Sequence, residues 1–241
     1  LGGGKAVIIG NSKTMKSEAL FRRFGKFVNG LAGRYITAED VGISPIDMTW
    51  VNMETDHVVG LPGKSGDPSP ITALGTYMGM KACAKKQFGS DSLAGKKVAV
   101  QGVGHVGEYL VKHLREENAE VYISDIDEGT LKHVSETYGA KVVGLNEIYD
   151  IDMDIYAPCA LGATVNDDTL SRLKCSIIAG SANNQLANEV KHGQAVLDKG
   201  IIYAPDFAIN AGGVINVYAE LTNNTPTWAL QKAEGIYDTI Y

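Results

Sequence analysis

The sequence predicts an α/β protein whose larger part is a doubly wound parallel sheet, joined to a second, smaller α/β domain. Short apolar runs alternate with amphipathic segments along most of the chain, which is the pattern of β/α units. The apolar runs consist almost entirely of Val, Ile and Ala, as expected for strands that are buried on both faces of a sheet.

The amino-terminal part predicts two strands and two helices. The strands are KAVIIG (5–10) and RYITA (34–38), and the short apolar stretch DHVVG (56–60) comes later. Between the strands, residues 17–31 place Leu20, Phe24, Phe27 and Leu31 at helical spacing, with Ser17 as a plausible N-cap. A second helix is expected around residues 44–55.

Pro and Gly accumulate in LPGKSGDPSP (61–70), where the apolar periodicity is lost, so the domain boundary is placed there. The predicted domains are 1–66 and 67–220, and a helical segment, 221–241, is expected to return toward the first domain. After the linker the sequence predicts a long helix over 69–89 that ends at Gly89. Further helices are expected at 108–118, 128–139 and over the tail from 210, and the predicted strands are 96–101, 120–127, 140–143, 154–159, 175–180 and 201–205.

Composition limits the class of function. The net charge is −6, from 28 acidic and 22 basic residues, which argues against a nucleic-acid or anionic membrane surface as partner. No apolar run approaches the roughly 20 residues that cross a bilayer, and no signal-peptide pattern is seen. Three cysteines without Cys-x-x-Cys or histidine spacing indicate reduced thiols in a cytoplasmic protein and no metal site.

A glycine-rich turn follows the strand at 96–101. Gly102, Gly104 and Gly107 have the G-x-G-x-x-G spacing and lead directly into a helix. Such a turn can be merely a tight connection, but in this position Gly104 leaves room for a pyrophosphate and Gly107 allows close packing of helix on strand. The free N–H groups at the start of the helix then face the phosphates. The sequence therefore predicts a Rossmann-like dinucleotide-binding domain.

Asp125 lies about 20 residues beyond the motif, at the end of the next strand, where a carboxylate accepts hydrogen bonds from a ribose diol. It can also be a solvated strand-end acid, as Asp127 is expected to be. No Arg or Lys follows Asp125 before Lys132, so no cation is available for a 2′-phosphate. These residues favour NAD over NADP.

Two polar residues of the first domain are candidates for proton transfer. Lys5 lies between three glycines and a predicted buried strand, where partial desolvation would lower its pKa and make it a general base. Asp40 lies at the end of another predicted strand, from which it could reach a cleft. The ordinary alternatives are a surface charge for Lys5 and a turn cap for Asp40.

Several segments resemble one family: GGGKAVIIG, GRYITAEDVG, PSPITALG, AVQGVGHVG, DIYAPCALGATVNDDT, IAGSANNQL and YAPDFAINAGGVINV. In this order they are similar to the amino-acid dehydrogenases that act on glutamate, leucine, phenylalanine and valine, and most similar to the members that act on leucine. The resemblance implies the reaction of an L-amino acid, water and NAD to a 2-oxo acid, ammonium and NADH. It implies Lys5 as general base on the attacking water and Asp40 as the group that moves protons at the substrate nitrogen, a pairing that needs no metal.

The resemblance also assigns binding residues. Thr72 corresponds to a residue near the nicotinamide amide, and Asn183, Asn184 and Asn210 to residues of cofactor loops, although asparagines after strands are also common turn formers. The full cofactor set implied is Thr72, Gly102, Val103, Gly104, His105, Val106, Gly107, Glu108, Asp125, Ala157, Pro158, Cys159, Ala160, Asn183, Asn184 and Asn210.

The substrate set implied is Gly3, Gly4, Ala38, Val59, Val214 and Val217. The last four line the side-chain pocket and are all small or aliphatic, which favours leucine, isoleucine and valine. Phenylalanine enzymes tend to carry Gly-Thr in place of Ala38-Glu39. Glutamate is disfavoured because none of the four positions holds a Lys or Arg for a second carboxylate.

Two departures from the family pattern affect this interpretation. The chain starts at the GGGK motif, so the stretch that would carry a second lysine, for the substrate carboxylate, is not in this sequence, and the linker is about three residues shorter than in leucine enzymes. Leu1 is therefore expected to be an internal residue of a longer enzyme that forms a homo-oligomer. The alternatives are a non-catalytic NAD-binding protein or phenylalanine specificity within the same family.

Overall fold

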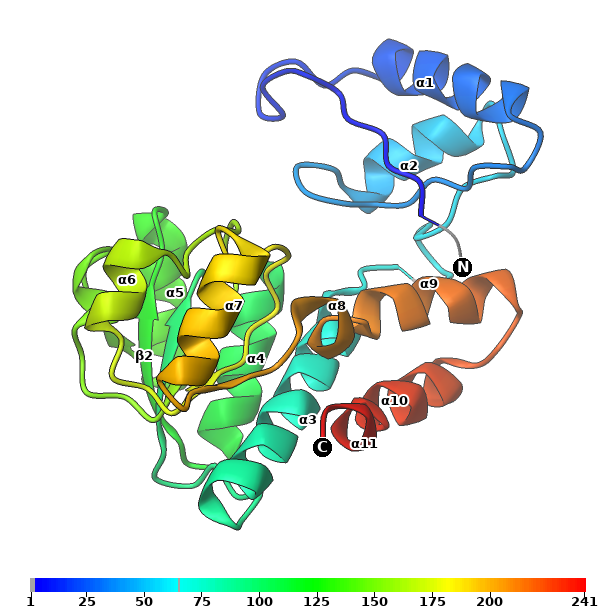
Figure 1. Cartoon of the computed structure of the whole chain (residues 1–241). Coiled ribbons are helices and arrows are strands. Elements are labelled where there is room, and N and C mark those ends of the chain that lie inside the picture. The colour runs from blue at the N-terminus through cyan, green and yellow to red at the C-terminus, as the bar shows by residue number, and fades with distance from the viewer. Residues whose placement is uncertain (1–2, 65) are drawn as a thin grey trace. The chain divides into compact units, whose positions relative to one another are not determined.

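The chain forms two compact units in the computed structural model, which describes residues 3–64 and 66–241 (Figure 1). Unit 1 comprises Leu1–Pro68 and Val214–Ala229, and unit 2 comprises Ser69–Gly213 and Leu230–Tyr241. Leu1, Gly2 and Ser65, which belong to the predicted GGGK start and the linker, lie outside the described residues. The boundary between the units after Pro68 lies two residues beyond the predicted one, after residue 66. The tail is predicted to return toward the first domain as one segment, 221–241, but it is divided between the two units after Ala229.

Unit 2 is built on a six-stranded parallel sheet of order β3-β2-β1-β4-β5-β6. The register places Val98 of β1 opposite Val121 of β2 on one side and opposite Ile155 of β4 on the other. The chain thus winds outward from β1 in both directions, which confirms the predicted doubly wound α/β fold. The strands are β1 (Lys97–Gln101), β2 (Glu120–Ser124), β3 (Lys141–Val142), β4 (Ile155–Pro158), β5 (Ile177–Ile178) and β6 (Ile202–Tyr203).

The alternation of side chains along the central strands divides the core of unit 2 into two layers. Val98 and Val100 of β1 point into one hydrophobic cluster, and Ala99, between them, points into the other. On β4, Ile155 and Ala157 join the first cluster and Tyr156 joins the second. All of these side chains are fully buried, so both faces of the sheet are covered, as the continuous apolar runs predict.

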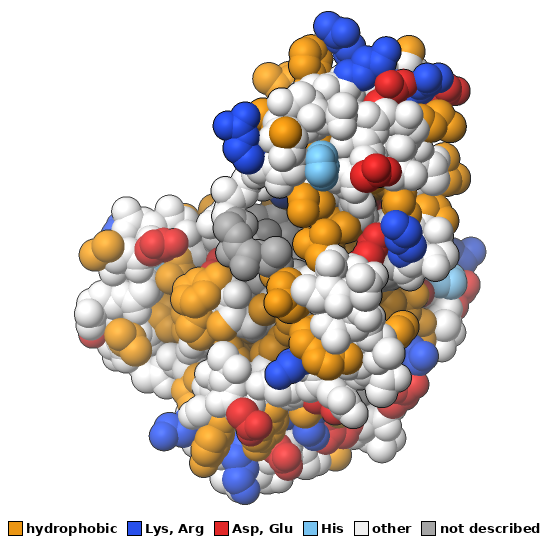
Figure 2. Space-filling view, turned by 90° about the vertical axis from the view of Figure 1, so that its right-hand side faces the viewer, with side chains coloured by type: hydrophobic (Ala, Val, Ile, Leu, Met, Phe, Trp, Pro, Cys, Tyr) orange, Lys and Arg blue, Asp and Glu red, His pale blue; other side chains and the backbone are white. Residues whose placement is uncertain are grey.

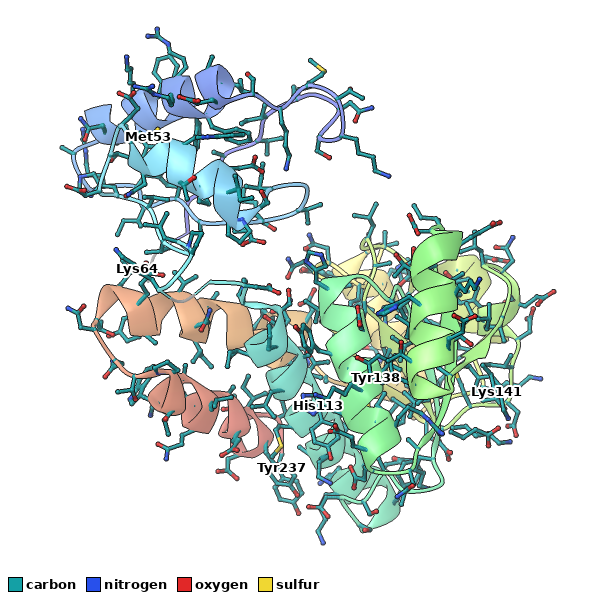
Figure 3. All side chains as sticks on the ribbon, turned by 180° about the vertical axis from the view of Figure 1, so that it is seen from behind. Met53, Lys64, His113, Tyr138, Lys141 and Tyr237 are labelled. Atoms are coloured by element: carbon teal, nitrogen blue, oxygen red, sulfur yellow. The ribbon has the colours of Figure 1, made fainter. Side chains whose placement is uncertain are left out.

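Helices cover the two faces of this sheet. The first layer packs against α3 (Ser69–Phe88), α4 (His105–Glu116) and α5 (Glu128–Tyr138), and the second against the short helix η1 (Glu147–Tyr149), α6 (Asp167–Arg172) and α7 (Glu189–Asp198). Figure 1 shows α6 and α7 in front of the sheet, and Figure 3, from behind, shows the opposite helix layer.

The last part of the tail belongs to unit 2 because it packs on two glycines of α3. A Cβ on Gly75 would lie 2.5 Å from Cδ1 of Ile236, which belongs to α11 (Ile236–Ile240). A Cβ on Gly79 would lie 3.3 Å from Cγ1 of Ile240, also of α11, and 2.6 Å from Cγ1 of Ile209, at the end of α8 (Asp206–Ile209). The remaining tail helices are α9 (Gly212–Leu221) and α10 (Pro226–Glu234).

Unit 1 has a small core between two helices, α1 (Glu18–Gly30) and α2 (Pro45–Asn52). Ser17 is the N-cap of α1 and accepts a hydrogen bond from the N–H of Leu20, as the sequence predicts. The predicted apolar face of α1 is half wrong: Leu20 and Phe24 are partly buried, but Phe27 and Leu31 are 61% and 42% exposed. The helix turns a neighbouring stripe inward because Gly25 lets it approach α2. A hydrophobic cluster of Phe21, Met48, Val51, Val58 and Leu61 results, and Val28 is buried as well.

The two strands predicted for unit 1 do not form. Residues 5–10 have no regular structure, with Val7 and Ile9 79% and 95% exposed. Residues 34–38 contribute a single parallel bridge, from Thr37 to Val58. A β-strand requires a hydrogen-bonded neighbour, and in the described part of unit 1 the first segment pairs with none.

The surface carries charges of both signs. On the face in Figure 2, basic side chains (blue) lie interspersed with acidic ones (red), and hydrophobic side chains (orange) are exposed between them. In the described ranges 3–64 and 66–241, no helix is long and apolar enough to span a bilayer.

Asp47 provides a test of what holds unit 1 together. Its carboxylate is almost fully buried at the start of α2 and accepts hydrogen bonds from Ser44 and, at 2.5 Å, from Lys16. Burial on its own raises the pKa of Asp47, but the hydrogen bonds from Lys16 and Ser44 outweigh that effect and bring the pKa below its ordinary value. The capping box that Asp47 makes with Ser44 thus contains a buried carboxylate whose charge is balanced by Lys16.

We expect Lys16→Met to lower the stability of unit 1 by about 2–3 kcal/mol at pH 7, because it leaves a buried carboxylate without its cation. A carboxyl with a depressed folded pKa stabilises above its unfolded pKa, near 4, and this contribution is lost as the pH falls further. The difference between variant and wild type should therefore shrink at pH 3. Denaturant unfolding, monitored by tryptophan fluorescence, measures this difference in the free energy of unfolding, since Trp50 and Trp228 both lie in unit 1. Lys13→Met, at an exposed position of the same loop, is the control.

Candidate functional site

The turn between β1 and α4 requires glycine at two positions. Gly102 has a φ of +92°, and a Cβ there would lie 2.6 Å from the backbone N of Ala160. A Cβ on Gly107 would lie 2.1 Å from the carbonyl oxygen of Gly102. By contrast, a Cβ on Gly104 would meet no atom within 4 Å, so this glycine borders open space. The turn is therefore packed closely on its inner side and leaves bare backbone on its outer side.

The start of α4 can receive phosphates. Gly104 is its N-cap and provides no side-chain hydrogen bond to the first turn. The orphan N–H groups of a helix start carry a partial positive charge that favours anions. His105, Val106 and Glu108, all assigned by the resemblance, belong to this first turn. The local structure fits the pyrophosphate of a dinucleotide, whose binding needs N–H donors and close backbone approach.

Asp125 follows β2 directly and is tied to the same turn. Its Oδ2 accepts a hydrogen bond from the N–H of Val103 at 2.8 Å, and its Oδ1 accepts one from the N–H of Asp127 at 3.0 Å. These bonds orient the carboxylate at the carboxyl edge of the sheet, where a ribose diol would be bound.

A shallow hollow of about 490 Å³ adjoins Asp125. Its walls are apolar, from Ile126, Val142 and Leu145, and its acidic groups are Asp125, Glu128 and Glu147. None of the described residues that line it is basic. The hollow thus presents acidic groups and no basic one beside Asp125.

The remaining predicted cofactor residues lie on loops that hydrogen-bond to one another. The N–H of Cys159 donates to the carbonyl of Gln101 at 2.7 Å, which places the 157–160 loop against the glycine turn. The N–H of Ala182 donates to the carbonyl of Pro158 at 2.9 Å, and this joins the 157–160 loop to the SANN turn. Ala157, in the core, and Ala160, against Gly102, complete this loop.

Asn210 joins the SANN turn to a third loop. Its Nδ2 donates to Oδ1 of Asn183 at 2.5 Å and to the carbonyl of Ser181 at 3.1 Å. Asn184 has a φ of +52°, a left-handed conformation that asparagine adopts in turns. This fits the alternative role of a turn former. Thr72, near the start of α3, lies beside this loop. Its Cα is so near Gly212 that a Cβ on this glycine would come within 2.7 Å of it. All the predicted cofactor residues therefore belong to unit 2.

Unit 1 brings Lys5 and Asp40 together in an ion pair. The other oxygen of Asp40, Oδ1, accepts a hydrogen bond from the N–H of Val41 at 2.8 Å. Gly4 lies next to Lys5 and against the ring of Tyr35, which a Cβ would approach to 2.9 Å, whereas Gly3 borders open space. The desolvation expected for Lys5 is not seen, because the side chains of Lys5 and Asp40 are 69% and 50% exposed and residues 5–10 form no buried strand.

The four aliphatic residues of the predicted substrate pocket also belong to unit 1. Ala38 and Val59 lie on two segments that the Thr37–Val58 bridge joins, and the N–H of Val59 donates to the carbonyl of Thr37 at 2.9 Å. Val59 is 3% exposed. Val214 and Val217 lie nearly one turn apart on α9, and Val214 is 57% exposed.

Sequence reasoning missed one residue beside this set. Glu220 of α9 accepts a hydrogen bond from the N–H of Gly60, next to Val59, at 2.9 Å. The one available signal was an acid in the last turn of a helix, where the helix dipole disfavours it. Within residues 3–64 and 66–241, no group of three His, Cys, Asp or Glu side chains is placed to hold a metal ion.

The glycine turn provides a direct test of nucleotide binding. Gly107→Ala should abolish NADH binding, because its Cβ would overlap the carbonyl of Gly102 and force α4 away from β1. Gly193→Ala, inside α7, is the matched control: its Cβ would make an ordinary contact at 3.8 Å with Leu186. The control should keep the wild-type affinity and gain about 0.5–1 kcal/mol of stability. Enhancement of NADH fluorescence measures the dissociation constant, and normal binding by Gly107→Ala would contradict the role given to the turn.

Comparison with known proteins places these features in one family. The Glutamate/Leucine/Phenylalanine/Valine dehydrogenase profile matches residues 63–133 and 125–237, and the profile of the Glu/Leu/Phe/Val dehydrogenase dimerisation domain matches residues 1–57. Leucine dehydrogenase of Thermoactinomyces intermedius is 55% identical over 243 residues, covering 100% of this chain and 66% of that protein. Phenylalanine dehydrogenase of the same organism is 46% identical over 244 residues, covering 99% of this chain and 66% of that protein.

A solved structure gives the same result. The crystal structure of L-tryptophan dehydrogenase from Nostoc punctiforme matches with a TM-score of 0.78 and 46% sequence identity, covering 94% of this chain and 65% of that one. The chain thus spans about two thirds, 66%, of the length of the curated relatives that it matches.

Proposed function

The chain belongs to the Glu/Leu/Phe/Val dehydrogenase family, and we propose that it serves the reversible NAD-dependent oxidative deamination of branched-chain L-amino acids. The observation that carries this proposal is the ion pair of Lys5 and Asp40, in the unit that also holds four aliphatic residues for the substrate side chain. The match to a dimerisation-domain profile supports assembly as a homo-oligomer.

The paired side chains provide the proton transfers of the reaction. Bound NAD would supply the hydride acceptor for Cα of the amino acid, and the substrate would become an imine. Lys5, as general base, takes a proton from the water that attacks the imine carbon. Asp40 delivers a proton to the nitrogen of the resulting carbinolamine, and the direct contact between the two groups lets the proton taken up by Lys5 pass to Asp40. The nitrogen leaves as ammonia, which takes the proton of the carbinolamine hydroxyl and becomes ammonium while the 2-oxo group forms. The products are a 2-oxo acid, ammonium, NADH and a proton.

Residues of unit 2 would hold the coenzyme. The bare backbone at Gly104 and the uncapped start of α4 suit its pyrophosphate. The carboxylate of Asp125, oriented by Val103 and Asp127, suits the adenosine ribose. Thr72, Asn183 and Asn210 would border the nicotinamide end.

Small aliphatic side chains support the choice of substrate class. Ala38, Val59, Val214 and Val217 offer apolar surface without a cation, so a hydrocarbon side chain is favoured over the carboxylate of glutamate. Relatives named for leucine, phenylalanine and tryptophan are all similar to this chain. An aliphatic pocket separates substrates that differ by one methylene by only about 10- to 200-fold, so valine and isoleucine should also react.

A second candidate function is nucleotide binding without turnover. It is favoured by the exposure of Lys5 and Asp40, whose side chains are 69% and 50% accessible to solvent, because efficient proton transfer usually takes place where water is excluded.

The direct test is NADH formation from L-leucine and NAD, followed by absorbance. Lys5→Ala and Asp40→Asn should each lower kcat by about 10²- to 10⁴-fold, since each removes a proton-transfer group. NADH affinity should not change, because both residues lie outside unit 2. Lys13→Ala, at an exposed lysine of unit 1, should behave as wild type. Turnover that both variants retain would refute the assigned roles, and NADH binding without turnover of any leucine, valine, isoleucine, phenylalanine or tryptophan would support the second candidate.

A binding comparison tests the preference for NAD. We expect 5′-AMP to bind at least about 10-fold more tightly than 2′,5′-ADP, because the extra phosphate meets the carboxylates of Asp125, Glu128 and Glu147. Asp125→Ser alone should weaken 5′-AMP binding by about 10-fold without creating tight 2′,5′-ADP binding. Adding Glu128→Gln and Glu147→Gln should then improve 2′,5′-ADP binding. Equal affinity of the wild type for both nucleotides, measured by calorimetry, would contradict the preference.

A further inference from the structure

Glu220 makes a long-range hydrogen bond within unit 1. Its Oε2 lies 2.9 Å from the backbone nitrogen of Gly60, which is 160 residues away in the sequence. Its Oε1 is shielded from solvent. Glu220 occupies the last turn of α9, where the negative end of the helix dipole disfavours an acid. The hydrogen bond from the N–H of Gly60 thus comes to this carboxylate from outside its own helix.

Gly60 lies where the segments that carry Ala38 and Val59 meet. It follows Val59 directly, and a Cβ on Gly60 would lie 3.7 Å from both the Cβ and the backbone N of Glu39, the neighbour of Ala38. Gly60 is buried and has a φ of +80°, a conformation that other residues rarely adopt. A hydrogen bond that fixes the N–H of Gly60 therefore also fixes the backbone next to Ala38 and Val59.

The same carboxylate belongs to the helix that carries the other two pocket residues. Val217 and Glu220 are three residues apart on α9 and so share one face of the helix. Val214 lies one turn before Val217 on the same helix. Figure 3 shows α9 beside the segment that leads to Lys64, which is consistent with the Gly60–Glu220 bond.

We propose that Glu220 is a positioning residue for the substrate side-chain pocket. It connects the helix that bears Val214 and Val217 with the backbone at Ala38 and Val59, and so sets the width of the space between the two pairs. Glu220 has no part in proton transfer in this proposal, which rests on the function proposed above. Loss of the Glu220 carboxylate should weaken binding of the substrate side chain more than it slows the chemical steps.

Two substitutions of similar length test this. Glu220→Met removes the acceptor, and Glu220→Gln keeps an oxygen that can accept from Gly60. We expect Glu220→Met to raise the KM for leucine on the order of 10-fold, with a smaller effect on kcat, since a hydrogen bond to a charged group is lost. It should also reduce the preference for leucine over 2-aminobutyrate. Glu220→Gln should restore most of both parameters, and the affinity for NADH should stay unchanged in both variants because unit 2 is untouched.

Amide hydrogen exchange at Gly60 provides a readout that does not depend on turnover. Exchange should be slow in the wild type and in Glu220→Gln, and fast in Glu220→Met. The control Glu234→Ala removes an exposed carboxylate from α10 and should change neither kinetics nor exchange.

The proposal is overturned if the wild-type Gly60 amide is unprotected, or if Glu220→Met keeps the wild-type KM and preference for leucine. It is also overturned if Glu220→Gln is as impaired as Glu220→Met. A wild-type protein that oxidises no amino acid would contradict the proposed function itself. In that case the exchange rates of the two variants would still decide whether Glu220 holds this backbone.

Discussion

The close approach of backbone to backbone at the end of β1 is the constraint on which unit 2 depends. Gly107 lies so near the carbonyl of Gly102 that no side chain fits, and Gly102 is in similar contact with Ala160. This packing places the start of α4 directly over the carboxyl edge of the sheet. The nucleotide binding proposed for the unit rests on that placement, because the first N–H groups of the helix lack a side-chain cap.

The loops around this turn are held by hydrogen bonds, two between main-chain groups and one between side chains. Cys159 is bonded to Gln101, Ala182 to Pro158, and Asn210 to Asn183. Each bond joins a loop that follows one strand to a loop or strand next to it, so residues far apart in sequence form one continuous rim. The rim is thereby supported by the parallel sheet, whose strands all end at the same edge.

Unit 1 is organised differently, with little regular β-structure and a small core. Lys5 and Asp40 meet in an exposed pair, whereas the ion pair of Lys16 and Asp47 is largely buried at the start of α2. The buried pair stabilises the helix start, whereas the exposed pair is open to water. Two ion pairs of the same composition therefore contribute differently to stability because their exposure differs.

The sequence by itself determined the doubly wound sheet, the Ser17 cap and the glycine turn, because these follow from the periodicity of β/α units and from local patterns of capping and glycine spacing. It did not predict that residues 5–10 would lack a strand partner, that α1 would turn Phe21 and Val28 inward, or that Glu220 would bond to Gly60. Those features were decided by tertiary structure alone. A strand needs a neighbour, a helix face is chosen by the surface it packs on, and a contact across 160 residues leaves no local pattern.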